Sequence, residues 1–236
     1  MKRFLTVLGA VGATLVVLPM FAAFEAHVVN VTATIENAMS VQTRAISFGT
    51  TFPEEVLNQP LSVGLSQSFA SSSADGIQYV IRQKPKCGLP IQGSNPVAYS
   101  NYEQVTEDAL GNFVCPDANL GYVPLPLLCP FLSKHPDGVN DLQASSTNDG
   151  TLDAFHGPLT GWNASTSELY QVAGLLTKIT QDTIDNWTID LHVPCFKGSC
   201  AQDNIVPAAY QEDPALEHQE FGCDLWVETT GIVRAE

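Results

Sequence analysis

The sequence predicts an all-β protein, an antiparallel β-sandwich that carries a large loop-rich insertion. Apolar and polar residues alternate with a period of two in several short segments, which is typical of half-buried strands. Turn-forming residues separate these segments, and no segment has the periodicity of a long helix. With 236 residues, 44% of them hydrophobic, the chain is long enough and apolar enough to bury one sizeable core.

The N-terminal residues have the pattern of an export signal. Lys2 and Arg3 precede an uncharged, apolar run over residues 4–23, which ends in small side chains. This order is typical of a secretory signal peptide, although the run is also close to the ~20 residues that span a bilayer. We therefore expect residues 1–26 to be a cleaved signal peptide or a retained N-terminal anchor. Residues 27–236 are expected outside the cytoplasm as a single β-sandwich domain, with membrane contact only through an uncleaved N-terminus.

The first predicted strand, residues 27–41, begins almost where the leader ends. Its odd positions are largely apolar and its even positions mostly polar, so one face of the strand seeks a partner sheet. Such a strand offers main-chain hydrogen bonds along its length and can add to a sheet of another copy. It can equally complete a sheet of its own domain, which is the simpler reading. The candidates for strand donation are Val29, Val31, Ala33 and Ile35.

Alternation and turn residues place the remaining strands. The first half of the chain contains three more predicted strands, 46–53 ending at Pro53, 61–69 and 77–83. The second half contains strands over 168–180, 187–193 and 223–229. In 187–193 the alternation of Trp187, Ile189, Leu191 and Val193 with polar residues is the cleanest of the chain.

Residues 84–166 differ from the segments on either side. They hold nine of the 15 prolines and three of the six cysteines. Proline cannot donate to a strand ladder and is excluded from central strands. We therefore expect a disulfide-tied, loop-rich insertion here, with short strands inside it.

The six cysteines predict disulfides. An even number of cysteines in an exported chain is typical of a disulfide framework, and no second close pair or spaced histidine pair completes a zinc site. Six cysteines allow 15 pairings, and the sequence does not choose among them. The cysteines are Cys87, Cys115, Cys129, Cys195, Cys200 and Cys223.

Charge and missing motifs limit the classes of function. The formal net charge of −15 argues against nucleic acid as a partner, because Lys and Arg supply that affinity. No nucleophile elbow, zinc-protease motif or phosphate-binding loop is present, so the sequence does not predict an enzyme. The segment Glu217–Glu220 holds a histidine and two carboxylates, a pattern better explained by an exposed acidic loop than by a metal site. No cofactor is predicted, apart from a weak case for structural calcium at Asp149 and Asp153, where turn formation alone explains the pattern.

Two tryptophans are candidates for glycan contact. Trp162 lies in a predicted loop, and Trp226 shares the polar face of its strand with Asp224 and Glu228. Aromatic rings exposed in this way can act as platforms for sugars. They support the alternative of a secreted glycan-binding or host-surface-binding module.

The order of segments resembles the TasA/camelysin group of exported, fibre-forming bacterial proteins. The likeness covers residues 1–83: a leader, an adjacent strand, the element Ile46-Ser-Phe-Gly-Thr-Thr-Phe-Pro53, and the alternating Leu61–Phe69. The segments Asn30–Ala38 and Pro194–Cys200 also resemble uncharacterised exported proteins of small-genome bacteria. The resemblance implies a jelly-roll-like sandwich that polymerises by lending its N-terminal strand to the next subunit. The cysteine-rich 84–166 departs from that family.

These observations together favour an exported structural or adhesive protein of the cell surface or extracellular matrix. Its expected partner is a second copy of itself or a surface. A glycan-binding or host-surface-binding module is the alternative, and a secreted hydrolase with a site scattered along the sequence is the least favoured.

Overall fold

The computed structural model describes residues 33–116, 118–136, 154–202 and 206–234. The chain forms two compact units, residues 1–35 and 36–236. Of the first unit only residues 33–35 are described, and these are exposed and belong to no helix or strand. The expected leader, residues 1–26, lies outside the described residues. Among those that are described, no helix has the length and apolar character needed to cross a membrane.

The largest sheet of the second unit has four antiparallel strands. Their order is β1 (Met39–Val41), β2 (Val56–Leu65), β11 (Ile184–His192) and β9 (Leu132–Pro136). Strand β11 pairs with β2 on one side and with β9 on the other. Trp187, Ile189 and Leu191 of β11 are buried, as the alternation in the sequence predicts.

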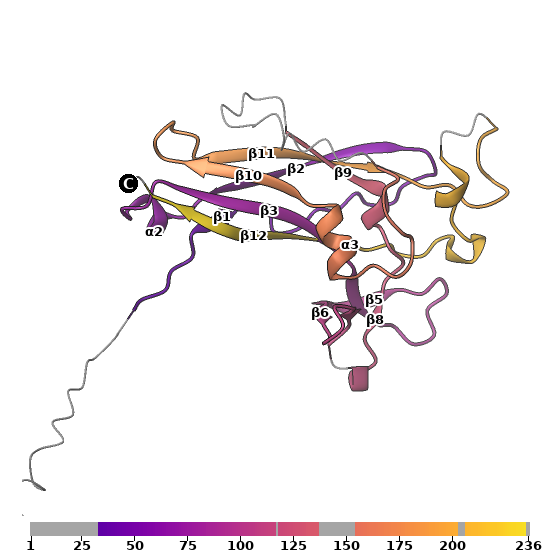
Figure 1. Cartoon of the computed structure of the whole chain (residues 1–236). Helices are drawn as coiled ribbons and strands as arrows, with labels where there is room; N and C mark the ends of the chain where they lie inside the picture. The colour runs from indigo at the N-terminus through magenta and orange to yellow at the C-terminus, as the bar shows by residue number, and fades with distance from the viewer. Residues whose placement is uncertain (1–32, 117, 137–153, 203–205, 235–236) are drawn as a thin grey trace, which may run out of the picture. The chain divides into compact units, whose positions relative to one another are not determined.

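A second antiparallel sheet has three strands. Their order is β10 (Val172–Thr177), β3 (Gly76–Lys84) and β12 (Asp224–Val233), as Figure 1 shows. Strands β3 and β12 confirm the predictions for 77–83 and 223–229. The prediction of a strand over 168–180 is wrong at its start, where helix α3 (Ala164–Leu169) lies. Asn163 caps this helix, since its Oδ1 accepts a hydrogen bond from the Thr166 amide at 3.0 Å.

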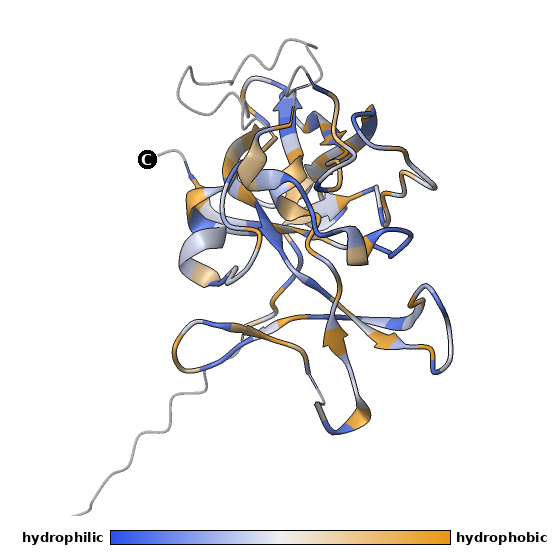
Figure 2. Ribbon diagram, turned by 90° about the vertical axis from the view of Figure 1, so that its right-hand side faces the viewer, coloured by the Kyte–Doolittle hydropathy of each residue, from blue (hydrophilic) through white to orange (hydrophobic). Residues whose placement is uncertain are grey.

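The two sheets bury one shared hydrophobic core. Leu61 and Ile189 of the first sheet pack in the same cluster as Ile81 and Leu176 of the second. In Figure 2 hydrophobic and hydrophilic residues alternate along the strands, which leaves one side of each strand for this core. The predicted all-β class is therefore confirmed, and the finer jelly-roll-like arrangement stays a prediction.

A disulfide-tied lobe follows β3 and corresponds to most of the predicted insertion. We use this name for residues 86–116 and 118–128. It contains a sheet of β5 (Tyr99–Gln104), β4 (Lys86–Pro90) and β8 (Val123–Pro124), and the pair β6 (Thr106–Glu107) and β7 (Phe113–Val114). Strand β9 also falls within 84–166, yet it belongs to the four-stranded sheet. The insertion therefore contributes to the main core as well as to a separate lobe.

The helical elements are short. They are α2 (Gln67–Ala70), α3 and the 3-10 turns η2 (Ala118–Leu120), η3 (Cys129–Phe131), η4 (Ala208–Tyr210) and η5 (Pro214–Leu216). Helix α2 ends the strand predicted over 61–69 early, because the Ser66 hydroxyl caps it by accepting from the Phe69 amide at 3.0 Å.

Two further strand predictions are corrected near the N-terminus. The segment 46–53 is not a strand, since Gly49 has a positive φ of 72° and Pro53 ends any ladder. Of the strand predicted over 27–41, residues 27–32 lie outside the described residues, 33–38 belong to no strand, and 39–41 form β1. Met39 pairs with Leu65, the last residue of β2, so β2 has no residues left to pair with earlier positions.

Candidate functional site

A cleft of about 400 Å³ opens between the two sheets beside β12. The core-facing side chains Leu61, Leu132 and Ile189 line it from the four-stranded sheet, each from a different strand. Leu225 and Val227 line it from β12. The volume lies within the range of ligand pockets, and apolar side chains share the lining with polar and charged ones, among them Arg44, Lys86, Gln104 and Asp224.

The outer edge of β12 has no strand beside it in the part of the chain that the structure describes. Strand β12 is the last strand of its sheet and pairs only with β3. Its ten residues therefore leave main-chain donors and acceptors along one edge. An unpaired strand edge next to an apolar cleft is the arrangement that accepts an added strand.

The cleft is closed by a segment that we call the strap, residues 44–51. Just before it, the Gln42 amide donates to the Ser62 carbonyl at 3.2 Å. Within the strap, no hydrogen bond joins any residue to another described residue. Ile46 and Phe48 are partly buried against the main core. Apolar packing of these two side chains is thus the main contact that holds the strap in place.

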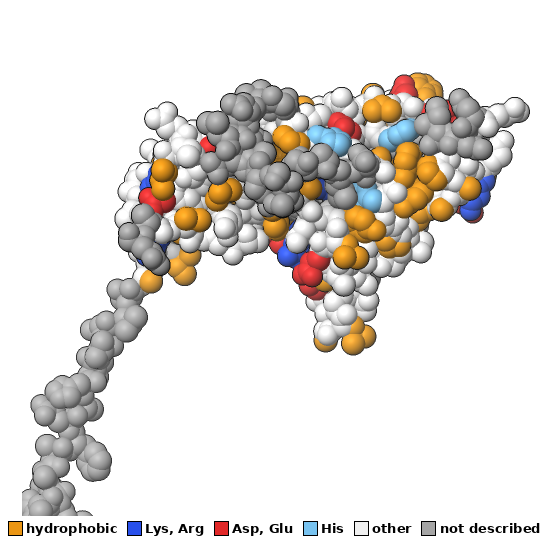
Figure 3. Space-filling model, turned by 45° about the horizontal axis from the view of Figure 1, so that its top comes forward, with side chains coloured by type: hydrophobic (Ala, Val, Ile, Leu, Met, Phe, Trp, Pro, Cys, Tyr) orange, Lys and Arg blue, Asp and Glu red, His pale blue; other side chains and the backbone are white. Residues whose placement is uncertain are grey.

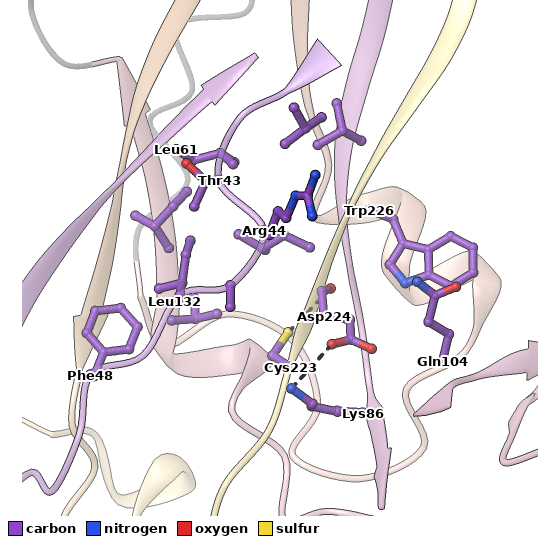
Figure 4. A pocket seen from close by; sticks show the side chains of 16 residues that line it. Thr43, Arg44, Phe48, Leu61, Lys86, Gln104, Leu132, Cys223, Asp224 and Trp226 are labelled. Atoms are coloured by element: carbon purple, nitrogen blue, oxygen red, sulfur yellow. Dashed lines mark hydrogen bonds and ion pairs between the residues drawn. The ribbon is translucent and has the colours of Figure 1, made fainter. Parts of the chain in front are cut away.

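Polar and charged side chains gather at the end of the cleft where β12 begins. Arg44 lies in the middle of the cleft, with Leu61 on one side and Trp226 on the other (Figure 4). Lys86 Nζ is 3.9 Å from Asp224 Oδ1. Burial raises the pKa of Asp224 above its ordinary value, and the nearby Lys86 ammonium partly offsets this shift.

Arg44 has no ion pair within the described residues. Its guanidinium therefore adds a positive charge to a protein whose net charge is −15. A carboxylate on a bound partner would meet a local field opposite to that of the rest of the surface.

The tryptophans predicted to contact glycans do not form an exposed platform. Trp162 is only 6% exposed, and its indole N–H donates to the Gln83 carbonyl at 2.9 Å, so the glycan prediction for this residue is wrong. Trp226 is half-buried, and the Lys84 ammonium lies 3.7 Å from its ring centroid. Lys84 also pairs with Glu107 at 3.4 Å and Glu228 at 3.3 Å, so this cation is balanced in place.

The structure pairs the six cysteines into three disulfides, as the even count predicts. The pairs are Cys87–Cys115, Cys129–Cys223 and Cys195–Cys200. Three disulfides indicate an oxidising environment. The first ties the lobe to itself, the second joins the start of β9 to the start of β12, and the third closes a short loop after β11.

His192 and His156 lie against aromatic rings, whereas His135 Nε2 is 3.0 Å from Asp190 Oδ2. His192 and Phe155 have ring centroids 4.6 Å apart, and so do His156 and Tyr170. Figure 3 shows histidine and apolar side chains next to one another on one face. Burial lowers the pKa of His192, while Glu54 acts in the opposite direction. Within the described ranges no three His, Cys, Asp or Glu side chains form a group that could hold a metal ion.

The other predicted site residues have different standings. Val29, Val31, Asp149 and Asp153 lie outside the described residues, so strand donation and structural calcium stay predictions. Ala33 and Ile35 are exposed, with Ile35 93% exposed.

Sequence reasoning missed the charged residues of the cleft. Arg44 stands alone between two predicted strands, and Lys86 belongs to a stretch predicted to be loop-rich. No spacing relates these positions to Asp224, which lies 180 residues after Arg44 and 138 after Lys86. The alternation in the sequence signalled the wall residues Leu61, Ile189, Leu225 and Val227, but none of the charged groups.

Comparison with protein-family models, with curated proteins and with solved structures finds none that matches this chain. The resemblance to the TasA/camelysin group therefore stays an expectation from sequence. The function must be argued from the cleft and the N-terminal segment themselves.

Proposed function

We propose that this chain is an exported structural or adhesive protein of the cell surface or extracellular matrix. In this proposal, copies associate when residues 28–35 of one copy lie along β12 of another. The observation that carries the proposal is the cleft beside β12, which combines apolar side chains from both sheets, a strand edge unpaired within the described residues, and a strap without hydrogen bonds to other described residues. The apolar leader and the three disulfides support export.

The dimensions of the donated segment fit this cleft. Eight residues in an extended strand span roughly 26 Å at ~3.3 Å per residue, and β12 has ten residues. One face of the segment is apolar, which suits Leu225 and Val227 of the accepting copy. The main chain of the donated segment would pair with the edge of β12, in the space that the strap occupies. The side chains of the segment would then replace Ile46 and Phe48 in their packing against the core.

Donation of this kind makes a head-to-tail interface, because the donating and accepting surfaces of each copy differ. The segment that precedes β1 is held in its own copy by three hydrogen bonds: the Ser66 amide donates to the Ala38 carbonyl at 2.9 Å, the Ser66 hydroxyl to the Asn37 carbonyl at 2.5 Å, and the Ser68 hydroxyl to Glu36 Oε2 at 3.3 Å. The proposed donated segment, residues 28–35, precedes all three contacts. Head-to-tail interfaces form rings when the rotation closes and filaments when it does not.

Substitutions on the two faces of the donated segment test the proposal. The Val29→Asp, Val31→Asp double variant of residues 27–236 places charges on the apolar face, whereas Asn30→Asp, Thr32→Asp places them on the polar face as a matched control. We expect filaments or large species by electron microscopy and size exclusion for the parent and the control, but monomers for the valine variant. Monodisperse parent protein at high concentration would count decisively against assembly.

A peptide experiment separates donation from pairing within one copy. A chain that begins at Glu36 lacks the segment, and a synthetic peptide of residues 28–35 supplies it in trans. We expect the shortened chain to stay folded and to bind this peptide, but not a peptide in which the alternation is scrambled. If the shortened chain unfolds, the strand belongs to its own domain, and the donation proposal is lost.

The alternative of a glycan-binding module now rests on Trp226 alone, because Trp162 is buried. Binding to a glycan array that is lost in a Trp226→Ala variant would favour this alternative. Absence of binding to every glycan would remove it.

A further inference from the structure

A second cavity, of about 670 Å³, lies on the other side of the strap. Its floor is the apolar end of β11 and the residue after it, Leu191 and Val193, which are 3% and 9% exposed. We call this cavity the aromatic pocket because four phenylalanines line it, Phe48, Phe52, Phe196 and Phe221. Its volume and composition are those of small-molecule sites.

The four rings come from three separate segments of the chain. Phe48 and Phe52 lie in or next to the strap, Phe196 in the loop closed by Cys195–Cys200, and Phe221 before Cys223. No two of these four rings stack or pack edge to face, although other aromatic pairs of the described chain do so. Phe52 is 66% exposed. Ring faces are therefore left for a guest.

Covalent and hydrogen-bonded contacts hold the walls in place. The disulfide Cys129–Cys223 anchors the wall next to Phe221, and the Gly222 amide donates to the Pro126 carbonyl at 2.8 Å. Opposite, the Glu54 amide donates to the Val193 carbonyl at 3.0 Å and fixes the chain after Phe52. Walls fixed before binding reduce the entropy that a ligand must offset.

The rim of the aromatic pocket is acidic. Glu217 and Glu220 are exposed on it, and Glu220 accepts hydrogen bonds from the Tyr102 hydroxyl at 2.6 and 2.7 Å. Lys86 is the fixed cation in the lining, but its ammonium lies near Asp224 and 4.6 Å from the Tyr102 ring centroid. His218 stands 3.7 Å from Glu217 and is highly exposed. The carboxylates therefore favour a cationic guest.

We propose that the aromatic pocket binds an alkylated ammonium group of the choline type. Aromatic faces attract such a cation through their quadrupole, the two rim carboxylates add Coulomb attraction, and Leu191 and Val193 receive its methyl groups. An anion would meet the two rim carboxylates, which disfavour it. The aromatic pocket shares Ile46, Phe48, Lys86 and Cys223 with the cleft beside β12, but its test, choline binding, has a different readout from assembly.

Titration with choline and with its uncharged isostere 3,3-dimethylbutanol tests the proposal on residues 27–236. We expect choline to bind with a millimolar dissociation constant, and the isostere to bind several-fold more weakly at matched ionic strength. Equal binding of the two would reduce the site to an apolar pocket and overturn the proposal. The absence of choline binding up to about 50 mM would also overturn the proposal, because a dissociation constant of this size corresponds to a binding free energy of only about 2 kcal/mol.

Variants locate the binding in this pocket. Phe52→Leu keeps an apolar side chain without a ring, and Glu217→Gln removes one charge without changing shape. Each is expected to weaken choline binding at least about twofold, as loss of an exposed cation–π contact does. Leu110→Ala, at a position 86% exposed in the lobe, is the control and should bind like the parent. Unchanged binding in both pocket variants would contradict the assignment.

Alkylated ammonium groups occur both in free compounds such as choline and in phospholipid headgroups. Sedimentation of the protein with vesicles distinguishes these two kinds of ligand. Binding to phosphatidylcholine vesicles, but not to phosphatidylglycerol vesicles, would identify the headgroup as the ligand. Binding of choline without sedimentation would identify a free ammonium compound.

Discussion

The ammonium of Lys134 lies inside the protein and donates a hydrogen bond to the Tyr170 carbonyl at 3.3 Å. Lys134 is fully buried, because it faces the core from β9 opposite Ile189 of β11. No carboxylate within the described residues forms an ion pair with it. Burial lowers the pKa of Lys134 to about 7, since desolvation disfavours the charged amine.

Lys134→Met is therefore expected to stabilise the fold at neutral pH. Replacement of a buried ionic group by an apolar side chain of similar size typically adds about 1–4 kcal/mol to the free energy of unfolding, or is neutral. Because the lysine pKa is lower in the folded than in the unfolded state, its cost is complete below pH 7 and fades as the pH rises toward 10.5. Urea unfolding at several pH values measures this difference.

Lys197→Met is the matched control for this prediction, because Lys197 is exposed. We expect its unfolding free energy to follow the parent at every pH. A Lys134→Met variant that is less stable than the parent at pH 6 would show that the hydrogen bond to Tyr170 outweighs desolvation.

Tyr102 and Glu220 form a hydrogen-bonded pair at the edge of the aromatic pocket. Burial raises the pKa of Tyr102 to about 12, and the hydrogen bond to Glu220 and the charge of this carboxylate add to the shift. Absorbance at alkaline pH, as the difference between the parent and Tyr102→Phe, reports this pKa. We expect Glu220→Gln to move it part of the way back toward 10. If the pKa of Tyr102 in Glu220→Gln equals that in the parent, burial alone causes the shift.

The sequence predicted best those strands in which apolar and polar residues alternate and whose partner strands have a matching apolar face. Strand β11 alternates throughout, so one buried face and one polar face are required whichever strands it pairs with. Helix α3 was missed because its capping residue, Asn163, lies outside the apolar pattern that decided the prediction. A local cap outweighed a weak strand preference over six residues.

The candidate sites depended on pairings that a sequence does not display. Arg44 lies in the strap that follows β1, and Lys86 begins β4, which follows β3. These two segments line the same cleft only because of the way the sheets are arranged. Lys134 is buried only because β9 pairs with β11 in one register and not the next. Trp162 was expected to be exposed because loops usually are, yet the Gln83 carbonyl draws its indole N–H inward.

Removal of the disulfide Cys129–Cys223 is expected to cost more stability than removal of Cys195–Cys200. The first closes 94 residues and the second closes 5, and the loss of unfolded-state entropy grows with loop length. For the Cys129→Ala, Cys223→Ala variant we expect a loss of about 4 kcal/mol. Thermal melting of the two double variants compares them directly. Equal melting temperatures would mean that strain or residual structure, rather than loop length, sets the contribution.

Gly174→Ala is expected to destabilise the three-stranded sheet. Gly174 of β10 lies opposite Tyr79 of β3, and a Cβ at this position would overlap the tyrosine ring. The ring has no room to move, because it is fully buried and its hydroxyl accepts from Trp187 Nε1 at 2.9 Å and donates to Asp185. Overpacking of this kind typically costs about 1–3 kcal/mol, measured by urea unfolding.

A Tyr79→Leu background identifies the cause of that loss. If overlap with the ring is responsible, Gly174→Ala costs less when the ring is absent, and the double-mutant cycle gives a clear interaction energy between the two sites. If the cost is the same in both backgrounds, the backbone conformation of Gly174, and not the packing of Tyr79 against it, is what β10 requires.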